Sequence, residues 1–178
     1  MTAREPYSRR NGCQGGYTLI ELILVMLVIG VVLAVAFPRF GVLGGGDLRL
    51  ESRTLIGHVQ GLYGEATFTR KLHRLVFDLD EQRYWAEVEV GGEQGFGPVG
   101  RTFLKPKILP DNIRLVDVTT ARSGKHSDGH AYAYFYPLGR ADFTTVHLRD
   151  GDQVMTLQVN PITGRVSVAD RYLEGLTG

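Results

Sequence analysis

The hydrophobic pattern along the chain changes character twice. Residues 19–37 are almost entirely apolar, and no charged or strongly polar side chain occurs between Leu22 and Phe37. After residue 47, apolar residues recur at helical spacing, and beyond residue 72 they alternate with polar ones. The pattern predicts an α+β protein: a long N-terminal hydrophobic helix, then an amphipathic helix on which an antiparallel β domain packs.

The first apolar run has the dimensions of a membrane helix. It would be about 28 Å long at ~1.5 Å per residue, close to the ~30 Å hydrocarbon core of a bilayer. Three arginines precede it at positions 4, 9 and 10, which favours a cytoplasmic N-terminus and an exported remainder. Glu21 stands at the entrance of this run. Because a charge at the edge of such a segment is costly in lipid, we expect it to have a function or a partner.

A break and a second helix follow. The stretch FGVLGGGD, residues 40–47, contains three consecutive glycines, each unfavourable in a helix by ~1 kcal/mol relative to alanine. Asp47 is the expected N-cap of a helix over roughly residues 47–71. One face of that helix carries an apolar stripe completed by Ser52. The stripe consists of Leu48, Leu55, Val59, Leu62 and Ala66.

About seven short strands are expected after this helix. Residues 75–79 and 84–90 alternate around a turn at residues 80–82, which predicts a hairpin. The glycine-rich stretch 91–101 is expected to be a loop, and SGKHSDGH, residues 123–130, a polar surface loop. The remaining strand candidates are residues 113–118, 131–136, 143–149, 153–159 and 165–169.

The segment GGYTLIE, residues 15–21, allows three interpretations. Ala34-Val35-Ala36 has the form of a signal-peptide cleavage site, but the apolar run exceeds the usual ~7–15 residues. A plain membrane anchor leaves Glu21 unexplained. The third interpretation is that the segment resembles the prepilin motif of type IV pilins and type II secretion pseudopilins. It has a small residue before the cut, an aromatic residue after it, and a glutamate at the fifth mature position.

The resemblance implies a specific processing route. Prepilin peptidase would cut between Gly16 and Tyr17, and Tyr17 would become the N-methylated first residue. Glu21 would be an assembly determinant, because its carboxylate can meet the new α-amino group of a neighbouring subunit. The competing interpretation is a carboxylate that reaches the membrane interface without a partner. Pro38 matches a helix-breaking proline common in these proteins.

The C-terminal region adds a second resemblance. FDLDEQRYW, FYPLGRADF and NPITGRV are similar to segments of the globular domain of the GspH/FimT family, which includes the H-type minor pseudopilin of type II secretion. The resemblance implies a pilin-like fold with three parts. These parts are a leader (1–16), a transmembrane and filament-core helix (17–40), and a periplasmic globular domain (41–178).

Composition and charge exclude several other functions. The cleaved leader would remove three of 20 basic and one of 19 acidic residues, leaving 17 against 18 and a mature net charge near −1. Such a chain has no electrostatic footprint for nucleic acid, so none is expected as a partner. The single cysteine, Cys13, lies in the leader and permits neither an intramolecular disulfide nor a thiolate metal site.

No catalytic or metal site is expected. His126 and His130 flank a short loop without a third ligand in register. Ser127, Asp128 and His130 are triad residue types, but neighbours in one loop do not form a nucleophile–base line. Asp78, Asp80 and Glu81 lack the pattern of a calcium loop and are expected to form a solvated turn.

The sequence therefore favours a minor pseudopilin of the H type, with no enzymatic activity and no cofactor. It would reside in the inner membrane by a single span, with its globular domain in the periplasm, and would join a pseudopilus. The implied partners are prepilin peptidase, other minor and major pseudopilins, the inner-membrane assembly platform and membrane lipid. Two alternatives remain open: a FimT-like minor type IV pilin for pilus assembly or DNA uptake, and a secreted soluble β-domain binding protein cut after Ala36.

Overall fold

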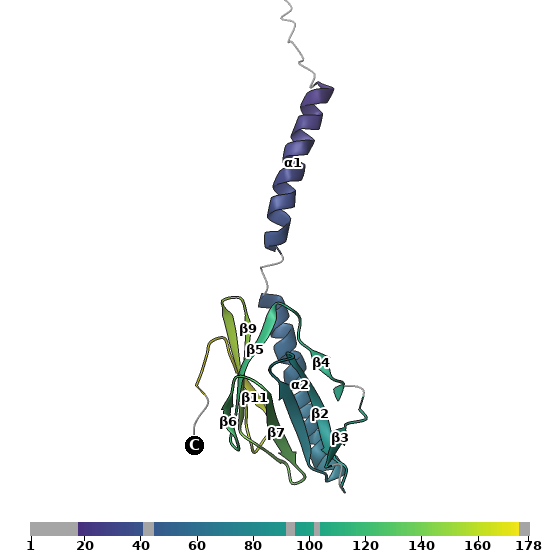
Figure 1. Cartoon of the computed structure of the whole chain (residues 1–178), viewed down its shortest axis with the longest axis vertical. Helices are drawn as coiled ribbons and strands as arrows, with labels where there is room; N and C mark the ends of the chain where they lie inside the picture. The colour runs from purple at the N-terminus through teal and green to yellow at the C-terminus, as the bar shows by residue number, and fades with distance from the viewer. Residues whose placement is uncertain (1–17, 41–44, 92–94, 102–103, 175–178) are drawn as a thin grey trace, which may run out of the picture. The chain divides into compact units, whose positions relative to one another are not determined.

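The structure, a computed structural model, describes residues 18–40, 45–91, 95–101 and 104–174. The chain divides into two compact units, Met1–Leu43 and Gly44–Gly178. The first contains helix α1 (Leu19–Phe40), and the second contains helix α2 (Gly45–Thr69) followed by strands (Figure 1). The predicted order of an amphipathic helix and then a β domain is therefore present.

Helix α1 begins directly after Thr18 and continues through Pro38 to Phe40. The proline therefore does not break the helix at its own position; the helix ends two residues later. Within the residues that the structure describes, no helix is both long and apolar enough to cross a membrane.

The strands of the second unit form two antiparallel sheets (Figure 1). Sheet A has the order β3-β2-β1-β7-β8, and β4 also pairs with β2. Its strands are β1 (His73–Asp78), β2 (Arg83–Glu89), β3 (Phe96–Pro98), β4 (Lys107–Ile108), β7 (His130–Tyr136) and β8 (Arg140–Ala141). Sheet B has the order β11-β10-β9-β5-β6. Its strands are β5 (Ile113–Thr120), β6 (Gly124–His126), β9 (Thr144–Asp150), β10 (Gln153–Val159) and β11 (Val166–Ala169).

Helix α2 supplies the centre of the hydrophobic core. All five residues of its predicted apolar stripe are buried, and the helix contacts strands of both sheets. Ser52 is also buried, and its hydroxyl donates to the Met155 sulfur at 2.9 Å, so the one polar residue of the stripe is satisfied. The prediction that an amphipathic helix packs on an antiparallel β domain is confirmed.

Strand β5 contains an irregularity that the alternating pattern conceals. Leu115 pairs with Leu148, whereas Asp117 pairs with His147, so the register shifts at a β-bulge. Because a bulge inserts one extra residue, it moves every later side chain of the strand to the opposite face. Val118 is consequently buried in the core, and Asp117 shares the other face of sheet B with His147.

Three local predictions were wrong: two expected loops contain strands, and the expected N-cap of α2 is misplaced. Strand β3 lies in the expected loop 91–101, and β6 lies in the expected loop 123–130. Together with β4 and β8, they are four strands of two or three residues that were not expected. Such strands are too short to show alternation. Asp47 is not the N-cap of α2, because the helix already begins at Gly45. As an acidic residue in the first turn, Asp47 still complements the helix dipole.

Candidate functional site

The first turn of α1 positions Glu21. Thr18 precedes the helix, and the Glu21 amide donates to the Thr18 hydroxyl at 3.3 Å and to the Thr18 carbonyl oxygen at 3.1 Å. Thr18 therefore acts as the N-cap, and Glu21 occupies the third helical position, which is the residue spacing of a capping box. The Glu21 side chain is exposed. Its negative charge lies where the positive end of the helix dipole stabilises it.

The structure does not describe the two residues predicted to be the processing site. Gly16 and Tyr17 lie outside the residues that the structure describes. Their roles in cleavage and N-methylation, and the roles of Glu21 and Pro38 in assembly, therefore remain predictions.

The described surface of α1 from Leu22 to Val32 is apolar on every side. Between Leu19 and Val32, all large apolar side chains are between 46% and 77% exposed. A helix that is hydrophobic all round is normally buried, in a protein core or in a membrane. This surface is therefore expected to contact lipid or other apolar helices.

Two of the turns that carried the C-terminal resemblance meet on one side chain of α2. The Tyr63 hydroxyl lies 2.6 Å from the carbonyl oxygens of both Gly139 and Ile162, and its single O–H is shared between these two acceptors. Gly164 packs directly against the Tyr63 ring. The segments FYPLGRADF and NPITGRV thus have a structural role: their turns anchor the β7–β8 and β10–β11 connections to the helix.

The third segment, FDLDEQRYW, is organised by a buried carboxylate. Asp78 accepts hydrogen bonds from the Glu81 amide at 3.1 Å and the Arg83 guanidinium at 3.0 Å, and His130 lies 3.6 Å away. Burial opposes ionisation of Asp78, but the hydrogen bonds from Glu81 and Arg83 and the attraction of His130 outweigh it. They hold the pKa of the carboxyl below its usual value. The expectation of a solvated turn is wrong for Asp78, which is buried.

The two histidines considered for metal binding are separated by the fold. His126 ends β6 in sheet B, and His130 begins β7 in sheet A, where its ring packs between Trp85 and Tyr132. Among the described residues, no group of three or more His, Cys, Asp or Glu side chains could hold a metal ion.

Comparison with known proteins gives two findings. Residues 11–37 match the family model described as the prokaryotic N-terminal methylation motif. Two solved structures of the minor pseudopilin EpsH from the type II secretion system of Vibrio cholerae resemble the chain. The first has a TM-score of 0.59 at 10% sequence identity, and the match covers 72% of this chain and 99% of the chain in that structure. The second has a TM-score of 0.58 at 11% identity, and the match covers 72% of this chain and 96% of the chain in that structure. No curated protein matches the sequence.

The chain has a pilin-like fold. A share of 72% exceeds what residues 1–43 can supply, so the likeness includes the β domain around α2. The pilin-like fold and the methylation motif were both expected from the sequence, and both are confirmed. Sequence reasoning missed residues that include Tyr63 and Gln82, whose side-chain oxygen accepts a hydrogen bond from the Leu115 amide at 2.7 Å. Their roles depend on contacts with segments about 30 to 100 residues away, which no local pattern reveals.

Proposed function

We propose that this protein is an H-type minor pseudopilin of a type II secretion system. The observation that carries the proposal is a combination within one chain: an N-terminal methylation motif at residues 11–37 and a pilin-like fold similar to that of EpsH. The motif alone fits both type IV pilins and pseudopilins, and the likeness to EpsH supports a minor pseudopilin.

Processing creates the site at which subunits join. Prepilin peptidase cuts between Gly16 and Tyr17 and leaves a free amine on Tyr17. A methyl donor then methylates this amine, which stays positively charged. In an assembling filament, this amine meets the Glu21 carboxylate of an adjoining subunit. The pairing occurs in an apolar environment, where an unpaired charge is costly, so it selects one register between neighbouring helices.

The apolar helix serves in two environments. Before assembly, the N-terminal apolar segment anchors the protein in the inner membrane, and the globular domain is in the periplasm. In the filament, the same apolar surface packs against equivalent helices of other subunits. The proposal gives the exposed residues between Leu19 and Val32 a partner in both states.

The protein acts as a structural component and has no catalytic role. It joins other minor and major pseudopilins on the inner-membrane assembly platform, near the tip of a short pseudopilus. This filament helps to move folded proteins through the outer-membrane channel.

A deletion strain tests the proposal and distinguishes it from the FimT-like alternative. Loss of the gene should abolish export of folded proteins into the medium and leave pilus assembly and DNA uptake intact. The full-length gene should restore export, whereas a Glu21→Ala variant should not. Normal export in the deletion strain, with lost pili or DNA uptake, would favour a minor type IV pilin instead.

A further inference from the structure

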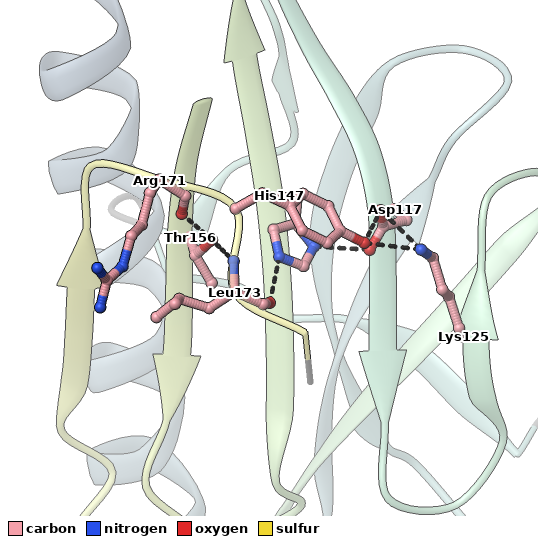
Figure 2. Close-up of polar contacts among 7 residues, drawn as sticks. Asp117, Lys125, His147, Thr156, Arg171 and Leu173 are labelled. Carbon is pink, nitrogen blue, oxygen red and sulfur yellow. Dashed lines mark hydrogen bonds and ion pairs between the residues drawn. The ribbon is translucent and has the colours of Figure 1, made fainter. Parts of the chain in front are cut away.

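The segment after β11 crosses the outer face of sheet B without pairing as a strand. Residues Asp170–Glu174, here called the C-terminal strap, are held by side chains of the strands beneath them (Figure 2). The Thr156 hydroxyl donates to the Arg171 carbonyl oxygen at 2.6 Å and accepts from the Leu173 amide at 3.1 Å. The His147 Nε2 lies 2.8 Å from the Leu173 carbonyl oxygen.

His147 faces a hydrogen-bond acceptor at each ring nitrogen. Its Nε2 faces the Leu173 carbonyl, and its Nδ1 lies 2.6 Å from Asp117 Oδ1 (Figure 2). A carbonyl and an ionised carboxylate can only accept, and a neutral imidazole has a single N–H. When Asp117 is ionised, both contacts are hydrogen bonds at once only if the ring carries two protons and is therefore positively charged.

The surroundings of the ring favour an ionised Asp117. The carboxylate accepts a hydrogen bond from the Tyr172 hydroxyl at 3.1 Å, and the Lys125 ammonium lies 3.4 Å away. Lys125 also donates to the Tyr172 hydroxyl at 2.7 Å; this bond and the attraction of Asp117 raise the pKa of Lys125 above its usual value. The Asp117 carboxylate therefore has three donors around it: the Tyr172 hydroxyl, the Lys125 ammonium and the His147 ring.

The strap also covers the charged pair. The Tyr172 ring stacks on the His147 ring with a centroid distance of 3.9 Å and an interplanar angle of 13°. The His147 side chain has no exposed surface, and that of Asp117 retains only 3%. The strap, the histidine and the carboxylate are therefore one unit, in which the charge is buried beneath the segment that it holds.

We propose that the C-terminal strap is a proton-dependent latch, closed by a doubly protonated His147 that bridges Asp117 and Leu173, and opened when that proton is lost. Removal of one proton leaves one ring nitrogen facing an acceptor without a hydrogen between them. A buried polar group without its partner is destabilising, and displacement of the strap lets water reach it. Because the stabilising form is the protonated one, the latch is closed at low pH and opens as the pH rises. Opening exposes the part of sheet B that carries Asp117, His147 and Thr156.

Hydrogen exchange on the full chain in detergent tests the latch. The Leu173 amide reports its state directly, because its acceptor is the Thr156 hydroxyl. Protection of the C-terminal peptide, corrected for the intrinsic exchange rate, is measured from about pH 5.5 to about pH 9.5, a span that includes the range in which histidine ordinarily titrates. We expect protection to fall at least about tenfold as the pH rises. Constant protection over this range would overturn the proposal.

Asp117→Asn gives the sharpest variant. Its amide can donate to Nδ1 of a neutral His147, which then still donates through Nε2 to Leu173, so both contacts persist without the extra proton. The variant should keep the strap protected at all these pH values. A fall in protection like that of the wild type would show that the pH dependence arises elsewhere.

Two threonine variants complete the test. Thr156→Val removes both of the hydroxyl's bonds to the strap and should lower protection at every pH. Thr145→Val is the matched control, because the Thr145 hydroxyl is buried without a hydrogen-bond partner among the described residues. It should leave the pH profile unchanged. Normal protection in Thr156→Val would contradict the latch.

Discussion

Gly164 occupies a position that no other residue can fill without rearrangement. Its φ is +64°, in the left-handed region that favours glycine, and an added Cβ would lie 2.4 Å from the Tyr63 ring. Tyr63 cannot move aside easily, because its hydroxyl is bonded to the two turns on either side. The glycine therefore fixes how closely the β10–β11 turn approaches α2.

Gly164→Ala should destabilise the protein strongly. Backbone strain contributes about 1–2 kcal/mol and the clash about 1–3 kcal/mol more, as measured by urea unfolding of the full chain in detergent. Gly151→Ala is the matched control, since Gly151 has a φ of +55° but open space around the added carbon. Gly151→Ala should lose only the stability that corresponds to backbone strain, about 1–2 kcal/mol. Equal losses in the two variants would contradict the packing role of Gly164.

Asp78 makes the stability of the β1–β2 hairpin pH-dependent. Its depressed pKa means that its stabilising contribution is fully present above the unfolded-state value of about 3.9 and is lost as the pH falls through the folded-state value. Asp78→Asn should lower the free energy of unfolding by about 1–3 kcal/mol at neutral pH. The difference between variant and wild type should shrink below about pH 4.

The control for Asp78 is Asp152→Asn, a change at an exposed aspartate in the β9–β10 turn. It should alter the unfolding free energy by less than about 0.5 kcal/mol. An Asp78→Asn effect that stays constant from pH 7 to pH 2.5 would contradict the assigned ionic role.

At the residue scale, sequence reasoning reached its limit at long-range polar contacts. Regular alternation along strand β5 would place Asp117 on the same face of the sheet as Leu115. The bulge between them places Asp117 on the opposite face, next to His147. The Leu115 amide donates to the Gln82 side-chain oxygen at 2.7 Å, a contact between two sheets. No local sequence pattern predicts such a bond, so neither Asp117 nor Gln82 was singled out from the sequence.

At the scale of elements, the proposed assembly function depends on helix α1 and its residue Glu21. The capping arrangement of Thr18 and Glu21 offers a purely local explanation of the glutamate, whereas pairing with a neighbouring amine requires its charge. Glu21→Gln separates the two, because glutamine also serves in a capping box but carries no charge.

Both Glu21→Ala and Glu21→Gln should be processed normally and lose most of their incorporation into filaments, roughly tenfold or more for a lost buried charge pair. Incorporation is measured by co-purification with the other pseudopilins. If the glutamine variant assembled like the wild type, the glutamate would be a helix cap and its charge would have no role in assembly.

The predictability of an element depended on its length. The amphipathic helix, expected over residues 47–71, spans 45–69, and the seven longer strands lie where alternation predicted them. Each has enough residues to show its period. The strands of two or three residues are set by pairing with a neighbour, as β4 is with β2, and that information lies elsewhere in the chain.

At the scale of the whole molecule, the two units should be separable. Among the residues whose burial the structure describes, the hydrophobic core lies entirely in the second unit, from Leu48 onward. A fragment of residues 45–178 should therefore fold alone and unfold cooperatively, with a thermal midpoint within about 5 °C of the globular transition of the full chain. Circular dichroism measures both. A fragment that lacks a cooperative transition would show that the apolar helix is needed for folding.

The proposed function depends most directly on where the mature chain begins. Mass spectrometry of the protein from cells with and without prepilin peptidase measures this. With the peptidase, the N-terminus should be a methylated Tyr17, and without it the residues up to Gly16 should remain attached. A mature chain that begins at Phe37, or an N-terminus that is the same in both strains, would contradict the account.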